Sequence, residues 1–242
     1  MRITFKTLRW KNFLSTGNVF TELNLDQHSN SLVVGTNGAG KSTLMNIASG
    51  TLQPDGGEIS IHGETIKNLS PKHATELGLT IVHQHPAVLP DLTIAENILI
   101  SVDEKYLKGD GKSVFENIEK ILIEFGLAVN LRDRVETLTV AQQHLLDLAK
   151  AFAVNPSILI LDEPTVGLDP ILRKQLWQIF KELNKKGKTL LISSHVMDEA
   201  ENCDHIFMIR DGKIIASGNT SELKSRTGLG NMEDVFISLV KS

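Results

Sequence analysis

The sequence predicts an α/β fold in which helices cover a parallel sheet, and three observations support this prediction. Short apolar runs of strand length alternate with helical segments, which is the pattern of α/β proteins. Residues 157–161 and 189–193 are apolar almost throughout, as is typical of parallel strands buried on both faces. Residues 86–153 carry only helix signals, so we expect a helical lobe inserted into the sheet domain.

The composition is that of a folded globular protein that needs no cross-links. Of the 242 residues, 41% are hydrophobic, and the one cysteine, Cys203, cannot pair within the chain, which suits a reducing compartment. The net charge of −4 argues against direct binding of nucleic acid, which usually requires a basic surface. No apolar run approaches the roughly 18 residues of a membrane-spanning helix, and the N-terminus lacks the apolar core of a signal peptide. We therefore expect contact with a membrane only through a partner.

The first third of the chain is expected to form strands around one helix. Ile3–Leu8 alternates like a strand, and Ser31–Val34 is a short apolar run that ends at a glycine-rich segment. A helix is expected to begin near Ser42 and to end at Gly50. Two further strand-like runs lie at 58–62 and 79–83.

Three capping boxes mark helix starts in the middle third. In each, a Ser or Thr is followed three residues later by Glu or Gln, so that side chains and backbone N–H groups satisfy one another. The pairs are Thr93 with Glu96, Ser113 with Glu116, and Thr139 with Gln142. Apolar faces at helical spacing follow the last two pairs, namely Ile118, Ile121, Leu122 and Phe125, and then Leu145, Leu148, Ala149 and Phe152.

The last third returns to strands. A helix is expected to begin after Asp169, which would cap it, with Pro170 in its first turn. The runs 206–210 and 213–217 flank Asp211-Gly212, which is typical of a two-residue type I′ hairpin. No internal repeat or linker interrupts the chain. We therefore expect a single domain over 1–242, with an α/β core (1–85 and 154–242) and a helical subdomain (86–153).

The strongest functional signal is a glycine-rich motif between a strand and a helix. Residues 35–42 read GTNGAGKS and match the pattern GxxxxGK[ST]. Glycines allow backbone N–H groups to surround phosphate oxygens, and the helix N-terminus adds the positive end of its dipole. Lys41 is expected to reach the β- and γ-phosphates of a nucleotide, and the Ser42 hydroxyl to bind Mg²⁺.

Two adjacent acids, Asp162 and Glu163, end the apolar strand at 157–161. The carboxyl ends of strands are where ligands bind in open α/β sheets. Asp162 is expected to hold Mg²⁺ through water, and Glu163 to orient or deprotonate the water that attacks the γ-phosphate. On its own, an Asp-Glu pair after a strand is usually a solvated turn, so this expectation depends on the phosphate-binding motif.

Six marks in this order resemble the ABC ATPase family over nearly the whole chain: residues 35–42, Gln84, Leu138–Gln142, Asp162-Glu163, Asp169 and His195. The resemblance implies a P-loop NTPase fold with a RecA-like sheet core, an antiparallel β subdomain and an inserted helical subdomain. It implies ATP and Mg²⁺ as ligands. The catalytic residues it implies are Lys41, Gln84, Glu163 and His195, and the metal contacts are Ser42, Gln84 and Asp162.

The resemblance also implies a set of nucleotide-contacting residues. They are Phe13, Gly35, Thr36, Asn37, Gly38, Ala39, Gly40, Lys41, Ser42, Thr43, Thr139, Val140, Ala141, Gln142 and Asp169. In this family Gln84 would also signal to the partner, Asp169 would lie at the dimer seam, and His195 would contact the γ-phosphate. An aromatic ring upstream of the P-loop stacks on adenine, and Phe13 lies at about the matching distance, with Trp10 as the competing candidate.

The signature segment Leu138–Gln142 reads LTVAQ, whereas the family's usual form is LSGGQ. Thr139 keeps a hydroxyl and caps the following helix, so free N–H groups can still meet a γ-phosphate held by the other chain. Val140 places a β-branched side chain where close backbone approach is expected. We therefore expect weaker contact between the chains or slower turnover.

Different stretches resemble different branches of the family. Residues 1–40 resemble the ATPases of recombination nucleases related to SMC proteins, and residues 83–97 with the signature resemble sugar-importer ATPases. Residues 193–200 and 233–236 resemble exporter ATPases. One hypothesis for this mosaic is a recombinant or designed sequence.

The function implied by the resemblance is that of an ATP-hydrolysing, dimerising subunit that powers a membrane transporter. Its partners would be a second ABC ATPase chain, identical or different, and a transmembrane permease. It would lie in the cytoplasm, on the inner face of the membrane. The alternatives are a DNA-repair ATPase, which normally carries a long coiled-coil insert that this sequence lacks, and an engineered mosaic without a transport partner.

Overall fold

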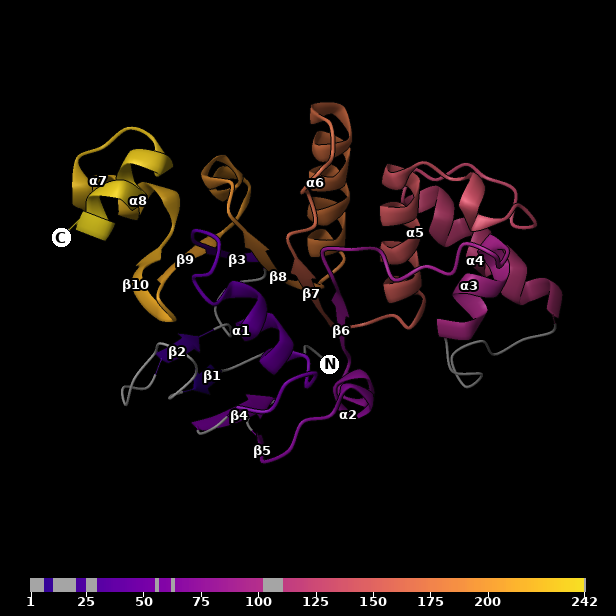
Figure 1. Ribbon diagram of the computed structural model, residues 1–242, viewed down its shortest axis with the longest axis horizontal. Coiled ribbons are helices and arrows are strands. Elements are labelled where there is room, and N and C mark those ends of the chain that lie inside the picture. Colours follow the sequence, from indigo (N-terminus) through magenta and orange to yellow (C-terminus); the bar gives the residue numbers. More distant parts are fainter. Residues whose placement is uncertain are drawn as a thin grey trace.

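The computed structural model describes residues 7–10, 21–24, 30–54, 57–61, 64–101 and 111–241, which form two sheets and their covering helices (Figure 1). The larger sheet consists of β3 (Asn30–Val34), β6 (Leu79–Val82), β7 (Ile158–Asp162), β8 (Thr189–Ser194), β9 (His205–Arg210) and β10 (Lys213–Gly218). Their order in space is β10-β9-β3-β8-β7-β6. Five strands run parallel, and β10 pairs antiparallel with β9.

Both faces of this sheet are buried. Successive side chains of a strand point to opposite faces, so each strand contributes to two hydrophobic clusters. In β3, Leu32 and Val34 belong to one hydrophobic cluster and Val33 to the other. The neighbouring strands divide in the same way, with Leu159, Leu161, Leu190 and Ile192 in the first cluster and Ile158, Ile160 and Leu191 in the second. The prediction that 157–161 and 189–193 are buried parallel strands is confirmed.

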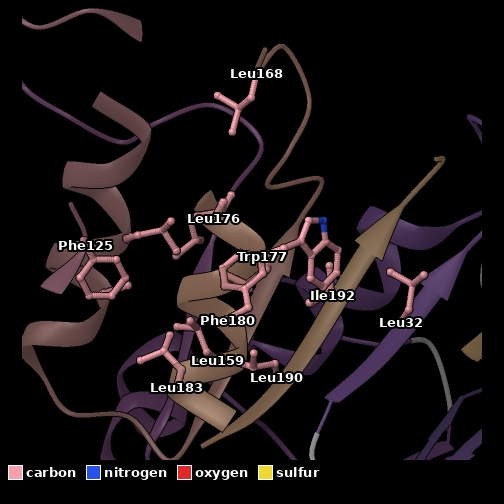
Figure 2. Packing of buried hydrophobic residues seen from close by; sticks show 14 of the residues in the cluster. Leu32, Phe125, Leu159, Leu168, Leu176, Trp177, Phe180, Leu183, Leu190 and Ile192 are labelled. Carbon is pink, nitrogen blue, oxygen red and sulfur yellow. The ribbon is translucent and has the colours of Figure 1, made fainter. Parts of the chain in front are cut away.

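Helix α6 (Pro170–Lys185) packs on the first face and supplies its largest side chains (Figure 2). Asp169 caps it as predicted, since its Oδ1 accepts hydrogen bonds from the N–H groups of Ile171 at 2.9 Å and Leu172 at 3.1 Å. Two C-terminal helices, α7 (Thr220–Thr227) and α8 (Met232–Lys241), complete this face beside β10. The buried apolar residues contributed by these three helices are Leu176, Trp177, Phe180, Leu183, Leu223, Met232, Val235 and Phe236.

The second face is covered by helix α1 (Lys41–Ala48) and by the smaller sheet. That sheet is antiparallel, in the order β2-β1-β4-β5, and consists of β1 (Thr7–Trp10), β2 (Thr21–Asn24), β4 (Gly57–Ile61) and β5 (Glu64–Ile66). Ile59 and Ile61 of β4 join Leu44 and Met45 of α1 in the second cluster. A short helix, α2 (Pro71–Glu76), adds Ala74.

Helices α3 (Ile94–Ser101), α4 (Gly111–Glu124) and α5 (Val140–Ala153) pack against one another at one end of the molecule (Figure 1). The capping boxes at Thr93 and Thr139 are confirmed by reciprocal hydrogen bonds with Glu96 and Gln142. The predicted start at Ser113 is wrong, because α4 already includes that residue. A serine is tolerated inside a first turn, so the pattern alone does not locate the helix start.

Most predicted strands agree with the structure to within one or two residues, and the differences lie at element ends, where local propensity is weakest. The strand expected at Ile3–Leu8 extends to Trp10, while residues 1–6 lie outside the described part. Asp211 and Gly212 both have positive φ, at 48° and 70°, which confirms the type I′ hairpin between β9 and β10. The outer limits of the predicted helical subdomain, 86 and 153, stay a prediction. No helix in the described ranges is long and apolar enough to cross a membrane.

Candidate functional site

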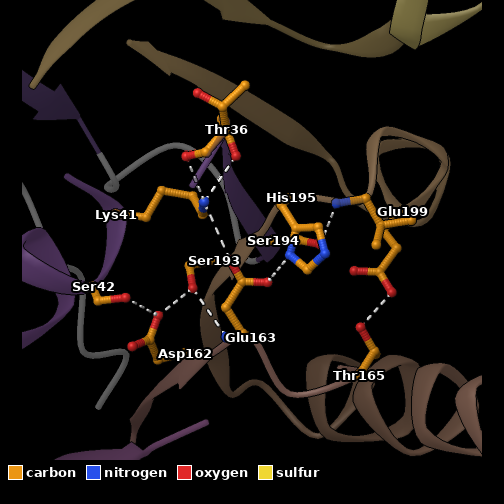
Figure 3. A network of polar contacts seen from close by, with 12 residues as sticks. Thr36, Lys41, Ser42, Asp162, Glu163, Thr165, Ser193, Ser194, His195 and Glu199 are labelled. Carbon is orange, nitrogen blue, oxygen red and sulfur yellow. Dashed lines mark hydrogen bonds and ion pairs between the residues drawn. The ribbon is translucent and has the colours of Figure 1, made fainter. Parts of the chain in front are cut away.

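The candidate site lies where three adjacent parallel strands end. In the sheet, β8 lies between β3 and β7, and Val34 is paired with Ser194 while Asp162 is paired with Ser193. The loop at 35–40 follows β3, Glu163 follows β7, and His195 follows β8. Residues more than 100 positions apart in the sequence therefore meet at one edge of the sheet (Figure 3).

The glycines of the loop are required by its geometry. Gly38 and Gly40 have φ of +81° and +97°, a region that side chains rarely adopt, and Gly40 directly precedes α1. A Cβ at Gly35 would lie 2.3 Å from the carbonyl oxygen of Ile209 in β9. The Gly212 N–H of the β9–β10 hairpin also donates to the Ala39 carbonyl at 2.9 Å. The hairpin thus contacts the loop just before α1 begins.

Lys41 is buried at the centre of the site, with only 5% of its surface exposed. Its Nζ donates to the carbonyl oxygens of Gly35 at 2.8 Å and Thr36 at 3.1 Å. The same ammonium lies 3.2 Å from Glu163 Oε1. A buried ammonium requires such partners, because leaving it unpaired away from water is costly.

Glu163 is held between two cationic or polar partners. Its Oε2 lies 2.6 Å from His195 Nδ1, while its Oε1 contacts Lys41. The Glu163 side chain is 7% exposed, whereas the His195 side chain is 39% exposed. The backbone of Glu163 has φ of +52°, which is uncommon for a residue with a side chain and clusters at functional sites. The predicted P-loop, acid pair and histidine are therefore brought together.

Asp162 joins the helix side of the site to the sheet side. Its Oδ1 accepts hydrogen bonds from Ser42 Oγ at 3.3 Å and from Ser193 Oγ at 2.5 Å. Hydroxyl and carboxylate oxygens are the hard donors that Mg²⁺ binds, and nucleotide sites need only one or two such ligands because phosphates and waters supply the others. Ser42 and Asp162 therefore fit a Mg²⁺ bound together with a nucleotide.

Gln84 lies at the same end of the sheet but outside this cluster. It follows β6, the strand next to β7, and its side chain is exposed. Within the described ranges the side chain has no hydrogen-bond partner. Gln84 therefore lies just after the end of β6, and no hydrogen bond within the described ranges joins it to Asp162 or Ser42.

The signature segment lies apart from the P-loop of the same chain. In Figure 1, β6 and α6 lie between α5 and α1, and Thr139–Gln142 form the first turn and cap of α5. Val140 is 65% exposed, and Asp169, at the start of α6, is exposed as well. Phe13 lies outside the described residues, so its predicted stacking on adenine stays a prediction, and the side chain of Trp10 is not described either.

Sequence reasoning missed three polar residues behind the acids. Ser193 contacts Asp162, as described above, and the Thr165 hydroxyl donates to Glu199 Oε1 at 2.5 Å, with both residues buried. Serine at the end of an otherwise apolar strand is a weak signal that was available for Ser193. Thr165 and Glu199 are 34 residues apart, and no local pattern joins them.

The comparisons with known proteins agree with this geometry. Residues 21–166 match the model of the family described as ABC transporter. Ribose import ATP-binding protein RbsA 2 of Agrobacterium fabrum is 38% identical over 208 residues, which are 83% of this chain and 40% of that protein. Galactose/methyl galactoside import ATP-binding protein MglA of Clostridium perfringens is 36% identical over 193 residues, or 79% of this chain and 38% of that protein. The chain thus spans about two fifths of the length of these curated relatives.

Solved structures share the whole fold. The ADP conformation of MJ1267, an ATP-binding cassette of an ABC transporter, has a TM-score of 0.79 and 26% identity, and the match covers 98% of this chain and 99% of that one. The dimeric structure of MJ0796, a bacterial ABC transporter cassette, has a TM-score of 0.73 and 25% identity, covering 90% and 97%. The predicted ABC ATPase architecture, with its parallel core and antiparallel part, is confirmed. The chain belongs to the ABC transporter family and has the fold of its ATP-binding cassette.

Proposed function

We propose that the chain binds MgATP at the strand ends and hydrolyses it, as a dimerising subunit that powers a membrane transporter. One observation carries the proposal. The Glu163 carboxylate lies between Lys41 and His195 and next to the Ser42–Asp162 pair, at the edge where the P-loop begins α1. Phosphate-binding, metal-binding and water-orienting groups are thereby collected in one place.

The P-loop binds the phosphates. Its positive-φ glycines and the start of α1 present backbone N–H groups at a helix N-terminus, where the dipole favours negative charge. Lys41 exchanges its carbonyl contacts on Gly35 and Thr36 for phosphate oxygens. Ser42 and Asp162 would hold Mg²⁺, which neutralises charge on the phosphates. Gln84, exposed after β6, is proposed as a further metal contact.

Glu163 orients or deprotonates the water that attacks the γ-phosphate. Its carboxylate is almost fully buried, so its position is set by the contacts with Lys41 and His195 rather than by solvent. His195 is partly exposed, which leaves one side of its ring available to contact the γ-phosphate. A preorganised arrangement of this kind stabilises charge as it develops in the transition state.

A second cassette, identical or different, completes each site. The N-terminus of α5 is exposed and lies away from the P-loop of its own chain, and Asp169 is exposed at the start of α6. We infer that Thr139–Gln142 of one chain meets the nucleotide on the P-loop of the other. The dimeric MJ0796 cassette, which has the same fold, supports the pairing of two chains.

A membrane permease is the proposed partner, and it would hold the chain at the cytoplasmic face of the membrane. The relatives RbsA and MglA are import ATP-binding proteins, which supports an import system. The alternative, a DNA-repair ATPase, gains no support from these relatives. The resemblance of residues 1–40 to recombination ATPases stays a prediction, since much of that stretch lies outside the described residues.

The test is steady-state MgATP hydrolysis over a range of protein concentrations, with Glu163→Gln as the matched variant. We expect the wild-type rate to rise more than linearly with protein, because two chains form each site. Glu163→Gln should keep nucleotide binding and lose turnover by about a hundredfold or more, roughly 3 kcal/mol of barrier. Near-normal phosphate release by this variant would refute the role of Glu163.

A further inference from the structure

We propose that Ser193 is a positioning residue that holds both acids of the hydrolysis site, Asp162 and Glu163, in their working geometry. The inference rests on the function proposed above. Ser193 lies in β8 and is fully buried. Its Oγ donates to Asp162 Oδ1 at 2.5 Å and accepts from the Glu163 N–H at 3.0 Å (Figure 3). One hydroxyl therefore joins the side chain of one acid to the backbone of the next.

The hydrogen bond from the Glu163 N–H to Ser193 lies at a residue with an unfavourable backbone conformation. Glu163 has φ of +52°, a conformation that a residue with a side chain rarely adopts without support from its surroundings. Its N–H is shared between the Ser193 hydroxyl at 3.0 Å and the Ser193 carbonyl at 3.2 Å. Both acceptors come from the same residue of the neighbouring strand. Ser193 thus stabilises the turn that points the Glu163 carboxylate toward Lys41 and His195.

The contact with Asp162 keeps that carboxylate oriented from the sheet side. Asp162 Oδ1 accepts from both Ser42 and Ser193. Ser42 belongs to the P-loop helix, and its hydroxyl would offer an oxygen lone pair to a metal ion while its O–H still donates to Asp162. Ser193 belongs to a buried strand, and its hydrogen bond to Asp162 does not depend on the metal. Ser193 thus holds the Asp162 carboxylate from the buried strand, and Ser42 holds it from the helix.

Two other buried serines show that this role is particular to Ser193. Ser31 is 1% exposed on β3, next to β8, and its hydroxyl has no hydrogen-bond partner. Ser194 follows in β8, and its hydroxyl accepts from the Val196 N–H at 3.0 Å. Neither hydroxyl has a carboxylate partner among the described hydrogen bonds. Ser31→Ala is therefore the matched control for removing a buried hydroxyl.

The experiment compares wild type, Ser193→Ala and Ser31→Ala in two measurements. For Ser193→Ala we expect kcat to fall about tenfold, the usual loss when a residue that orients a metal ligand is removed. Titration with a fluorescent ATP analogue should show unchanged affinity without Mg²⁺ and a smaller gain in affinity on adding MgCl₂. Ser31→Ala should match wild type in both measurements. Thermal unfolding checks that each variant is folded at the assay temperature.

The outcomes separate this inference from the proposed function. No hydrolysis by wild type under any condition would refute the proposed function. Hydrolysis by wild type, with Ser193→Ala equal to Ser31→Ala in kcat and in the effect of MgCl₂, would overturn the role of Ser193. Should Ser193→Ala not fold, Ser193→Cys decides the question, since a thiol has similar size and is only a weak donor. A folded Ser193→Cys with wild-type kcat and wild-type response to MgCl₂ would count against the inference.

Discussion

The P-loop edge and the exposed ends of α5 and α6 differ in how completely this chain satisfies their polar groups. At the P-loop edge, Lys41 and Glu163 are each 5% exposed and contact one another. At the start of α5, the Thr139–Gln142 box satisfies its own N–H groups, but Val140 is 65% exposed and nothing in the described structure covers it. The polar groups of the first region are satisfied by tertiary contacts, whereas those of the second are satisfied only by local capping.

This difference separates two kinds of experiment. Variants of the buried edge should act on nucleotide binding and chemistry in a single chain. Variants at the exposed helix ends should act mainly on the step in which two chains meet, because the capping residues are not part of the buried edge.

Lys41→Ala should produce the largest effect on binding. The variant removes the ammonium expected to contact the phosphates and leaves Glu163 without one of its two partners. We expect nucleotide affinity to fall by about a hundredfold or more, since hydrogen bonds to charged groups contribute roughly 1.5–3 kcal/mol each. Equilibrium dialysis with ATP measures it, and Lys120→Ala, an exposed lysine of α4, is the control. Unchanged affinity in Lys41→Ala would place the nucleotide elsewhere.

Thr139→Ala should affect the exposed region without changing nucleotide binding by one chain. Loss of this cap destabilises α5 by about 1 kcal/mol, because the Gln142 N–H loses its acceptor. We expect a severalfold lower rate and a higher protein concentration at half-maximal hydrolysis. The control is Ser70→Ala, which removes the cap of α2, a helix away from the site. Equal effects of the two variants on the concentration dependence would contradict a role of α5 in pairing.

Protonation of His144 should have a smaller effect, and only on the stability of the fold. Burial lowers its pKa from 6.5, the His85 imidazole lowers it further, and the Asp147 carboxylate partly opposes the shift. Because the folded chain binds this proton less readily than the unfolded chain, stability contributed by neutral His144 is complete above pH 6.5. It is lost as the pH falls below 6.5 toward the lowered pKa.

Urea unfolding at pH 7.5 and pH 5.5 tests this prediction. The midpoint should fall with pH in the wild type, and it should fall less in His144→Gln, whose side chain does not titrate in this range. Asp147 and His85, the charged groups that act on His144, remain in both proteins, so the difference between the two proteins isolates His144. The same pH dependence in both would show that His144 is not the titrating group.

The parts of the fold that could be predicted are those with local chemical causes. Asp169 and Thr139 are caps whose partners lie two or three residues away, and Asp211-Gly212 forms a turn by itself. The P-loop was recognisable because its glycines and Lys41 are contiguous. Helices α7 and α8 were not predicted, although local caps mark their starts, at Asn219 with Glu222 and at Asn231. The edge strands β2 and β5 were not predicted either, because such short strands depend on the strands with which they pair.

The candidate site shows the same division. The adjacent residues Asp162 and Glu163 can be recognised in the sequence as an acid pair at a strand end. The sequence does not indicate, however, which strands lie beside β7 in the sheet. Only the order of strands brings Ser193 to Asp162 and Thr165 to Glu199. The catalytic and nucleotide-contacting roles assigned to Gln84, Asp169 and His195 stay predictions, as does adenine stacking by Phe13.

The close approach of Gly35 to the Ile209 carbonyl limits how the cassette can be shortened. The family match ends at residue 166, but both neighbours of β3 in the sheet, β8 and β9, lie after that point. A fragment limited to the matched residues would retain every letter of the phosphate-binding motif. It would nevertheless lack the two strands that flank β3. It would also lack the β9–β10 hairpin, whose Gly212 N–H donates to the Ala39 carbonyl. Shortened or circularly permuted forms should therefore keep residues 189–218, because these strands support the phosphate-binding loop.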